Sequence, residues 1–229
     1  MTNMRKKPSF KKNFYEMQAW QEGKTVCGID EVGRGCLAGP LVTAAVILPK
    51  NKTHRLLKDS KILTEAEREK AFSWIAAHCF YGIGILHPRI IDQRNIWQTT
   101  LLTMKKALVH LLSGCPEQPS AILVDAMPLK VDDTGYSHIQ VHHFIKGESK
   151  SSSIAAASIV AKVSRDRLMK QLESVFPGYG FAEHKGYSTP RHKAAVRELG
   201  STIIHRTSFL ENPSLIFIEH DLEQQQTLC

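Results

Sequence analysis

Short apolar runs punctuate the chain and predict its strands. Val26 to Asp30 and Ala121 to Val124 are nearly continuous apolar runs, and an acidic residue closes or follows each of them. Runs of this length, bounded by glycine, proline or polar clusters, are typical of buried strands. Three further runs have the same character: Leu41 to Leu48, Phe80 to Leu86 and Ile139 to Ile145.

Helical patterns separate these runs. The sequence Thr64-Glu65-Ala66-Glu67 fits a capping box, in which side chains at both ends satisfy free backbone N–H groups. A helix over about 152–176 begins with three alanines, whose small side chains permit close packing on a sheet. Residues 190–200 also have a helical pattern. Strands that alternate with helices predict an α/β fold. A stripe at spacings of four and three predicts one more buried helical face: Trp97, Leu101, Met104, Leu108 and Leu111.

Length and composition indicate one globular domain with appendages. The chain has 229 residues, of which 42% are hydrophobic and 23% charged. We expect a basic N-terminal extension over 1–24, a main domain over 25–205, and a tail over 206–229 that packs on the domain or trails from it. The extension is interpreted as a lead-in whose aromatic residues hold it to the body, with a nucleic-acid arm as the alternative. Those aromatic residues are Phe10, Phe14, Tyr15 and Trp20.

Net charge, cysteine content and the length of the apolar runs limit the kinds of partner and site that we expect. The formal net charge of +8 favours polyanions such as nucleic acid. Five cysteines without a Cys-x-x-Cys pair argue against a zinc site and a disulfide framework. No apolar run approaches the roughly 18 residues of a membrane span, and no apolar segment follows the basic N-terminus. We therefore expect a cytoplasmic monomer with no membrane partner.

Acidic residues at the predicted strand ends carry the candidate chemistry. Asp30 and Glu31 close the first strand, Asp125 follows the fourth, and Glu148 lies just after the fifth. Strand ends converge at one edge of an open α/β sheet, so these acids are expected to share a pocket. Clustered carboxylates raise one another's pKa, and a pair of divalent cations such as Mg²⁺ would relieve that repulsion. Taken alone, Asp30 or Asp125 could equally be a strand-end turn residue or a helix cap, and Glu148 could merely favour a helix N-terminus through its dipole.

Two further features of the sequence bear on this candidate site: a glycine-rich turn that belongs to it and an acid that does not. The glycine-rich turn Gly33-Arg34-Gly35 follows the acidic pair, and its backbone N–H groups suit an anion or a sugar hydroxyl. Acids and turn together indicate metal-assisted chemistry on a phosphodiester. Asp166, in contrast, is expected in mid-helix, paired with a neighbouring arginine.

An ordered series of motifs resembles type 2 ribonuclease H, the ribonuclease HII family. The match runs from about Cys27 to His192. Its main motifs are Asp-Glu-Val-Gly-Arg-Gly at 30–35, Gly-Pro-Leu-Val at 39–42, Asp-Ser-Lys at 59–61, Val-Asp-Ala at 124–126, Lys-Gly-Glu-Ser at 146–149, the alanine-rich stretch at 156–163 and His-Lys-Gly-Tyr at 184–187.

The resemblance implies both a fold and an activity. The fold would be ribonuclease H-like, with a central five-stranded mixed sheet flanked by helices and a small C-terminal helical extension. The activity would be endonucleolytic cleavage of the RNA strand in RNA–DNA hybrids, and nicking 5′ of single ribonucleotides in duplex DNA. The products would carry 3′-hydroxyl and 5′-phosphate ends. Mg²⁺ or Mn²⁺ would be the cofactor, and its ligands would be Asp30, Glu31, Asp125 and Glu148.

The resemblance also assigns substrate contacts. Gly33, Arg34 and Gly35 would sense the ribose 2′-hydroxyl, the group that distinguishes RNA from DNA. Tyr187 would stack on the deoxyribose beside the cut. Lys61, Lys146 and Lys162 are candidates for phosphate contact or for balancing the charge of the acids. His184 and His192 rank below them, as residues that would contact the nucleic-acid backbone or shuttle protons.

Departures from the family pattern leave alternatives open. The fourth acid is usually aspartate, and the extra methylene of Glu148 moves its carboxylate by about 1.5 Å. Glutamate at this position is found in the sister type, ribonuclease HIII, which needs several consecutive ribonucleotides. Arg34, where HIII typically has lysine, and the short N-terminus argue against that type. A non-catalytic hybrid-binding module is the other alternative, although all four acids are present. A sliding clamp also stays open as a partner, but the Gln-rich tail carries no clear clamp-binding motif.

Overall fold

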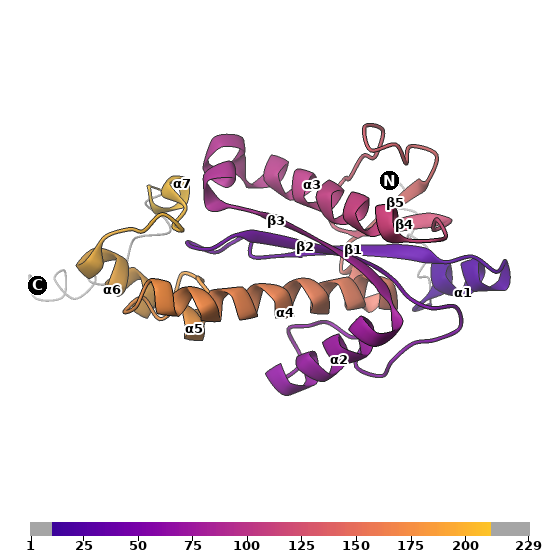
Figure 1. Cartoon of the computed structure of the whole chain (residues 1–229), viewed down its shortest axis with the longest axis horizontal. Helices are drawn as coiled ribbons and strands as arrows, with labels where there is room; N and C mark the ends of the chain where they lie inside the picture. The colour runs from indigo at the N-terminus through magenta and orange to yellow at the C-terminus, as the bar shows by residue number, and fades with distance from the viewer. Residues whose placement is uncertain (1–10, 212–229) are drawn as a thin grey trace, which may run out of the picture.

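A computed structural model describes residues 11–211, and within this range five strands form one mixed sheet in the order β3-β2-β1-β4-β5 (Figure 1). β1 pairs antiparallel with β2, and β2 pairs antiparallel with β3. β4 lies parallel to both β1 and β5. The predicted five-stranded mixed α/β sheet is therefore confirmed. The strands are β1 (Val26–Val32), β2 (Leu41–Ile47), β3 (Phe80–Leu86), β4 (Ala121–Asp125) and β5 (Gln140–Phe144).

The register of the central strands sets the position of the acids. Ile29 of β1 pairs with Val124 of β4, so Asp30 and Asp125 are the next residues on two neighbouring parallel strands. Side chains alternate across a strand, so these two acids lie on the face opposite Ile29. The prediction that β1 ends at Asp30 is wrong. Its ladder with β2 continues to Val32, because the β2 side of β1 remains paired after β4 has ended.

Helices cover both faces of the sheet (Figure 1). α3 (Pro88–Gly114) packs on one face and α4 (Ser152–Val175) on the other, with α2 (Glu65–His78) against α4. Gly28 makes the close approach of α4 possible, since a Cβ there would lie 2.1 Å from the carbonyl carbon of Ser153. The fully buried alanines 155–157 then pack toward β2 as the sequence predicted.

Of two predictions made for the helices, the capping box at 64–67 is confirmed and the buried stripe that starts at Trp97 is partly wrong. The capping box is present, with the Thr64 hydroxyl accepting from the Glu67 N–H at 3.2 Å. In α3 the stripe begins later than predicted. Met104 and Leu108 are fully buried, whereas Trp97 is 45% exposed. The helix is broken at Asn95, whose φ of 66° is not helical, so Trp97 lies in the first turn after this break.

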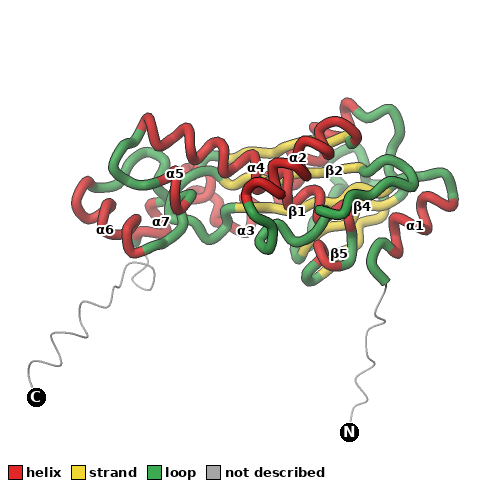
Figure 2. Tube along the Cα trace, turned by 90° about the horizontal axis from the view of Figure 1, so that it is seen from below, coloured by secondary structure: helices red, strands yellow, loops and turns green. Residues whose placement is uncertain are grey.

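Short helices mark the two ends of the molecule (Figure 2). α5 (Phe181–His184), α6 (Pro190–Leu199) and α7 (Thr207–Leu210) gather at the end of α4, which gives the small C-terminal helical extension. α1 (Phe14–Gln21) lies at the opposite end, where the sequence predicted only a lead-in. The Tyr15 ring packs 5.4 Å from that of Phe144; Phe10 and the Gln-rich tail lie outside the described residues. Within residues 11–211, no helix is long and apolar enough to cross a membrane.

Candidate active site

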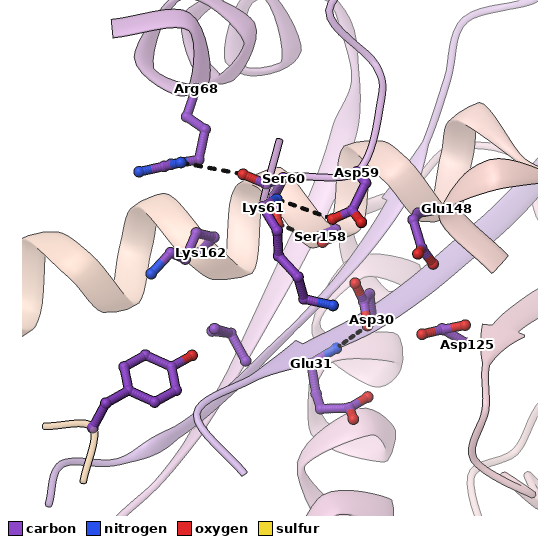
Figure 3. A pocket seen from close by; sticks show the side chains of 12 residues that line it. Asp30, Glu31, Asp59, Ser60, Lys61, Arg68, Asp125, Glu148, Ser158 and Lys162 are labelled. Carbon is purple, nitrogen blue, oxygen red and sulfur yellow. Dashed lines mark hydrogen bonds between the residues drawn. The ribbon is translucent and has the colours of Figure 1, made fainter. Parts of the chain in front are cut away.

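A cavity of about 570 Å³ opens where β1 and β4 end. The four predicted acids converge on one part of it, from β1, from β4 and from the turn before α4 (Figure 3). The facing wall is formed by the loop before α2, by α2, by α4 and by the loop after α5, and three of its side chains are basic. Its residues include Ser60, Lys61, Arg68, Ser158, Lys162 and Tyr187.

Asp30 and Glu31 form the most crowded part of the acidic end. Asp30 is 8% exposed, and its carboxylate accepts the Glu31 N–H at 2.7 Å. Burial, followed by the charges of Glu31 and Asp125, raises the Asp30 pKa well above its usual value, although a hydrogen bond from Ser158 opposes this. Burial likewise raises the Glu31 pKa to about 6, against the opposing charge of Arg34. Both carboxylates therefore favour a proton or another cation beside them.

Asp125 and Glu148 are joined through the turn between β5 and α4. This turn contains the short 3-10 helix η1 (Gly147–Ser149), which carries Glu148. The Gly147 N–H donates to Asp125 Oδ1 at 2.7 Å. A Cβ at residue 147 would lie 3.1 Å from that same oxygen, so glycine permits this contact. The backbone beside Glu148 is thus fixed to the carboxylate at the end of β4.

The acidic end has the properties that a hard divalent cation needs. Glu31 Oε2 is buried without a hydrogen-bond partner, and the neighbouring carboxylates raise each other's pKa. Within residues 11–211, no group of three or more His, Cys, Asp or Glu side chains has the spacing to hold an ion by itself. Such a site suits Mg²⁺, which commonly takes one or two carboxylates and completes its shell with water and substrate phosphate.

Two buried arginines, Arg165 and Arg206, contact the glycine-rich turn from the interior of the protein. Arg206 donates to the carbonyl oxygens of Gly33 at 2.6 Å and Arg34 at 2.8 Å. Arg165 packs under Gly33, where a Cβ would lie 2.3 Å from its Nε. Gly33 also has a φ of 93°, which favours glycine. The carbonyl oxygens of Gly33 and Arg34 therefore already have hydrogen-bond partners within the protein. Gly35, in contrast, is exposed and has open space around it.

Sequence reasoning gave neither arginine a role. Arg165 and Arg206 are fully buried, and Arg206 is the first residue of the segment that we predicted as a tail. Most of their partners lie 125 to 173 residues away along the chain, although Arg165 also donates to the Lys185 carbonyl. No local pattern marks such an arginine, so only the tertiary structure identifies it.

Tyr187 lines the same cavity as the acids and is 40% exposed. The ammonium of Lys162 is 5.8 Å from its ring centroid. A hydrogen bond of 2.8 Å joins the Tyr187 carbonyl to Nδ1 of His192. His184 and His192 themselves are buried and are not among the described residues that line the cavity.

The predicted lysines differ in their surroundings. Lys61 extends into the cavity, and Lys162 lines it while pairing with Asp166 at 2.8 Å (Figure 3). Lys146 is exposed but is not among the described residues that line this cavity. The predicted arginine partner of Asp166 is corrected, because Lys162 is its close partner. Arg68, from α2, approaches Asp166 only to 4.0 Å.

The wall opposite the acids contains residues that the sequence had not singled out. Ser60 and Ser158 share a hydrogen bond of 2.9 Å, which joins the loop before α2 to α4. Arg68 donates to the Ser60 carbonyl at 3.1 Å (Figure 3). Asp59 accepts the Lys61 N–H at 2.9 Å. The Asp-Ser-Lys motif at 59–61 was the available signal, but only Lys61 had been given a role.

Comparison with known proteins assigns the family. A family model described as Ribonuclease HII matches residues 27–212. A ribonuclease HII from Levilactobacillus brevis is 46% identical over 196 residues, which cover 85% of this chain and 72% of that protein. One from Desulfotalea psychrophila is 48% identical over 188 residues, covering 80% of each chain. The chain therefore belongs to the ribonuclease HII family of endoribonucleases.

Solved structures show the same architecture. A chain in the PCNA:RNase HII complex from Archaeoglobus fulgidus has a TM-score of 0.67 and 28% identity, covering 80% of this chain and 94% of that one. Bst-RNase HIII in complex with Mn²⁺ also has a TM-score of 0.67, at 22% identity, covering 88% of this chain and 72% of that one. The second likeness bears on the fold alone. The ribonuclease H-like fold is thus confirmed.

Proposed function

We propose that this protein is a divalent-metal-dependent endonuclease that cuts the RNA strand of RNA–DNA hybrids and nicks duplex DNA 5′ of a single embedded ribonucleotide. The products carry 3′-hydroxyl and 5′-phosphate ends. One observation carries this proposal: four carboxylates from three elements, β1, β4 and η1, converge beside a glycine turn whose carbonyls are held by buried arginines. Removal of RNA primers and of ribonucleotides in DNA would be its use.

The acids Asp30, Glu31, Asp125 and Glu148 would hold Mg²⁺ or Mn²⁺. Divalent ions in such sites supply activation of the attacking water and neutralise charge on the leaving oxygen. The unpartnered Glu31 oxygen and the raised Asp30 pKa support this role.

The substrate would lie between the turn and Tyr187. Backbone groups of Gly33, Arg34 and Gly35 contact the ribose 2′-hydroxyl, and the open space at Gly35 leaves room for the sugar. Tyr187 stacks on the neighbouring deoxyribose. Phosphates are contacted by Lys61, Lys146 and Lys162, so that binding is largely independent of sequence and sensitive to salt.

The cellular setting belongs to the same proposal. We place the protein in the cytoplasm, as a monomer acting on RNA–DNA hybrids and ribonucleotide-containing DNA. The similar chain from Archaeoglobus fulgidus was solved as a complex with PCNA. A sliding clamp is accordingly the protein partner to test first.

A labelled DNA duplex with one embedded ribonucleotide tests this function. Wild type, Asp125→Asn and the control Asp132→Asn are incubated with Mg²⁺, with Mn²⁺ or with EDTA. Asp132 is exposed and does not line the cavity. We expect a metal-dependent cut 5′ of the ribonucleotide that is lost only in Asp125→Asn. Cleavage of longer RNA tracts alone would indicate HIII-like specificity, and tight binding without any cut would indicate a non-catalytic module.

A further inference from the structure

The N-terminal segment is attached to the start of α4, immediately after the turn that carries Glu148. Asn13 Oδ1 accepts the Ser152 N–H at 2.8 Å. Glu16 Oε1 accepts the Ser153 N–H at 3.0 Å and the Ser151 hydroxyl at 2.5 Å. The first N–H groups of a helix have no partner within the helix. Here a segment from more than 130 residues earlier in the chain supplies those partners.

Glu16 is an unusual residue for a lead-in segment because its side chain is buried. It is 1% exposed, and its second oxygen, Oε2, is buried without a hydrogen-bond partner. Burying a carboxylate is costly unless it is hydrogen-bonded. Charge-assisted bonds to the N-terminus of α4, together with the helix dipole, offset that cost. The contact therefore fixes α1 and the start of α4 to one another.

Hydrogen bonds continue from this contact into the active site. Ser151, the partner of Glu16, donates its own N–H to the Gly147 carbonyl at 2.9 Å. Lys150 also donates to that carbonyl at 2.9 Å, while its carbonyl accepts from the Asn13 N–H at 2.7 Å. Gly147 in turn donates to Asp125. Glu148 thus lies on a turn held at one side by Asp125 and at the other by the N-terminal segment.

We propose that Glu16 is a positioning residue for Glu148. It fixes the N-terminus of α4 and so the position of the fourth carboxylate relative to Asp30 and Asp125. Glu16 lies outside the residues 27–212 that the family model matches. This inference rests on the proposed function, because it gives Glu148 a part in metal binding.

The test compares Glu16→Ala with two matched variants. Glu16→Gln keeps an oxygen that can accept from Ser151 and Ser153, and Glu22→Ala removes an exposed carboxylate beyond the end of α1. For Glu16→Ala we expect kcat to fall about tenfold, corresponding to ~1.4 kcal/mol, with the KM for duplex unchanged. The Kd for Mn²⁺, measured by calorimetry without substrate, should rise several-fold. Glu16→Gln should restore most of both values, and Glu22→Ala should match wild type.

A double-mutant cycle separates positioning from general stability. In a Glu148→Ala background, Glu16→Ala should change the Kd for Mn²⁺ less than twofold. An equal effect in both backgrounds, or a loss of thermal stability with kcat and Kd unchanged, would overturn the proposal. If Glu16→Ala does not fold, Asn13→Gly removes a single acceptor at a position whose φ is 64°, and it should show smaller changes of the same sign. Full activity of Glu148→Ala would refute the positioning role, while Asp125→Asn still decides the proposed function separately.

Discussion

At the scale of single residues, the acidic end is destabilising until a cation occupies it. The Asp30 pKa lies well above its usual value because of burial and the charges of Glu31 and Asp125. An acid whose pKa is higher in the folded than in the unfolded protein binds its proton more tightly when folded. The free energy of unfolding therefore decreases as pH rises through the interval between the two values. At pH 7 the free energy of unfolding of the metal-free protein is therefore lowered by the buried Asp30 carboxyl group.

Asp30→Asn should consequently stabilise the metal-free protein while abolishing cleavage. The amide keeps the shape of the side chain and removes the buried charge. Each kcal/mol regained should raise the unfolding midpoint by about 2–4 °C for a chain of this size. Thermal unfolding in EDTA at pH 7 measures this, with Asp132→Asn as the control that should change neither property. A lower midpoint for Asp30→Asn would show that the carboxylate contributes more through its hydrogen bonds than it costs by repulsion.

Glu31 gives a second prediction, for metal affinity. Its pKa of about 6 in the metal-free protein means that it is mostly ionised at pH 7 and mostly protonated at pH 5. Protons then compete with the metal, and this group alone should weaken Mn²⁺ binding about tenfold between those two pH values. Calorimetric titration at pH 7, 6 and 5 measures the change. In Glu31→Gln that dependence should be clearly shallower, and an unchanged slope would contradict the assignment.

At the scale of elements, three buried histidines from α5, from α6 and from the segment after α6 form a hydrogen-bonded cluster beside Tyr187. Thr202 donates its N–H to Nδ1 of His205, which places the His205 proton on Nε2. That proton is donated to Nε2 of His192 at 3.1 Å, so His192 carries its own proton on Nδ1 and donates it to the Tyr187 carbonyl. Gly186 donates to Nδ1 of His184 in the same way. The hydrogen-bond network thus assigns one neutral tautomer to each ring.

Acidification should loosen this cluster. Burial lowers the pKa of both His192 and His205 to about 4, below the usual value of 6.5. Between these values the unfolded chain binds more protons than the folded one, so stability present above pH 6.5 is lost as pH falls toward 4. His192→Asn does not titrate and can still donate to the Tyr187 carbonyl. We expect the unfolding midpoint to fall less between pH 7 and 5 in this variant than in wild type, and equal falls would refute the argument.

At the scale of the whole molecule, local patterns predicted the sheet and the acids but not what holds them. The β3 run at 80–86 matches its strand residue for residue, because the apolar run itself marks the strand, although β3 is an edge strand on which Phe80 and Ile85 are exposed. Asp30 and Asp125 could be placed together for the same reason, since Asp30 ends the apolar run 26–30 and Asp125 directly follows the apolar run 121–124. Glu16 and Arg206 could not be predicted. Each is a charged residue in a polar segment, and its burial depends on partners more than 130 residues away.

The overall charge of +8 predicts salt-sensitive binding, and the structure predicts which lysine contributes to it. Lys61 extends into the cavity, whereas the Lys162 ammonium already pairs with Asp166 at 2.8 Å. A phosphate contact adds about 0.7–0.9 to the slope of log K against log salt concentration. Binding of the ribonucleotide-containing duplex is measured in the Asp125→Asn background, without metal, from 50 to 200 mM salt. Lys61→Gln should reduce the slope by nearly one and Lys162→Gln by clearly less, because an internal ion pair releases fewer counterions; the reverse order would mean that Asp166 gives up Lys162 to the substrate.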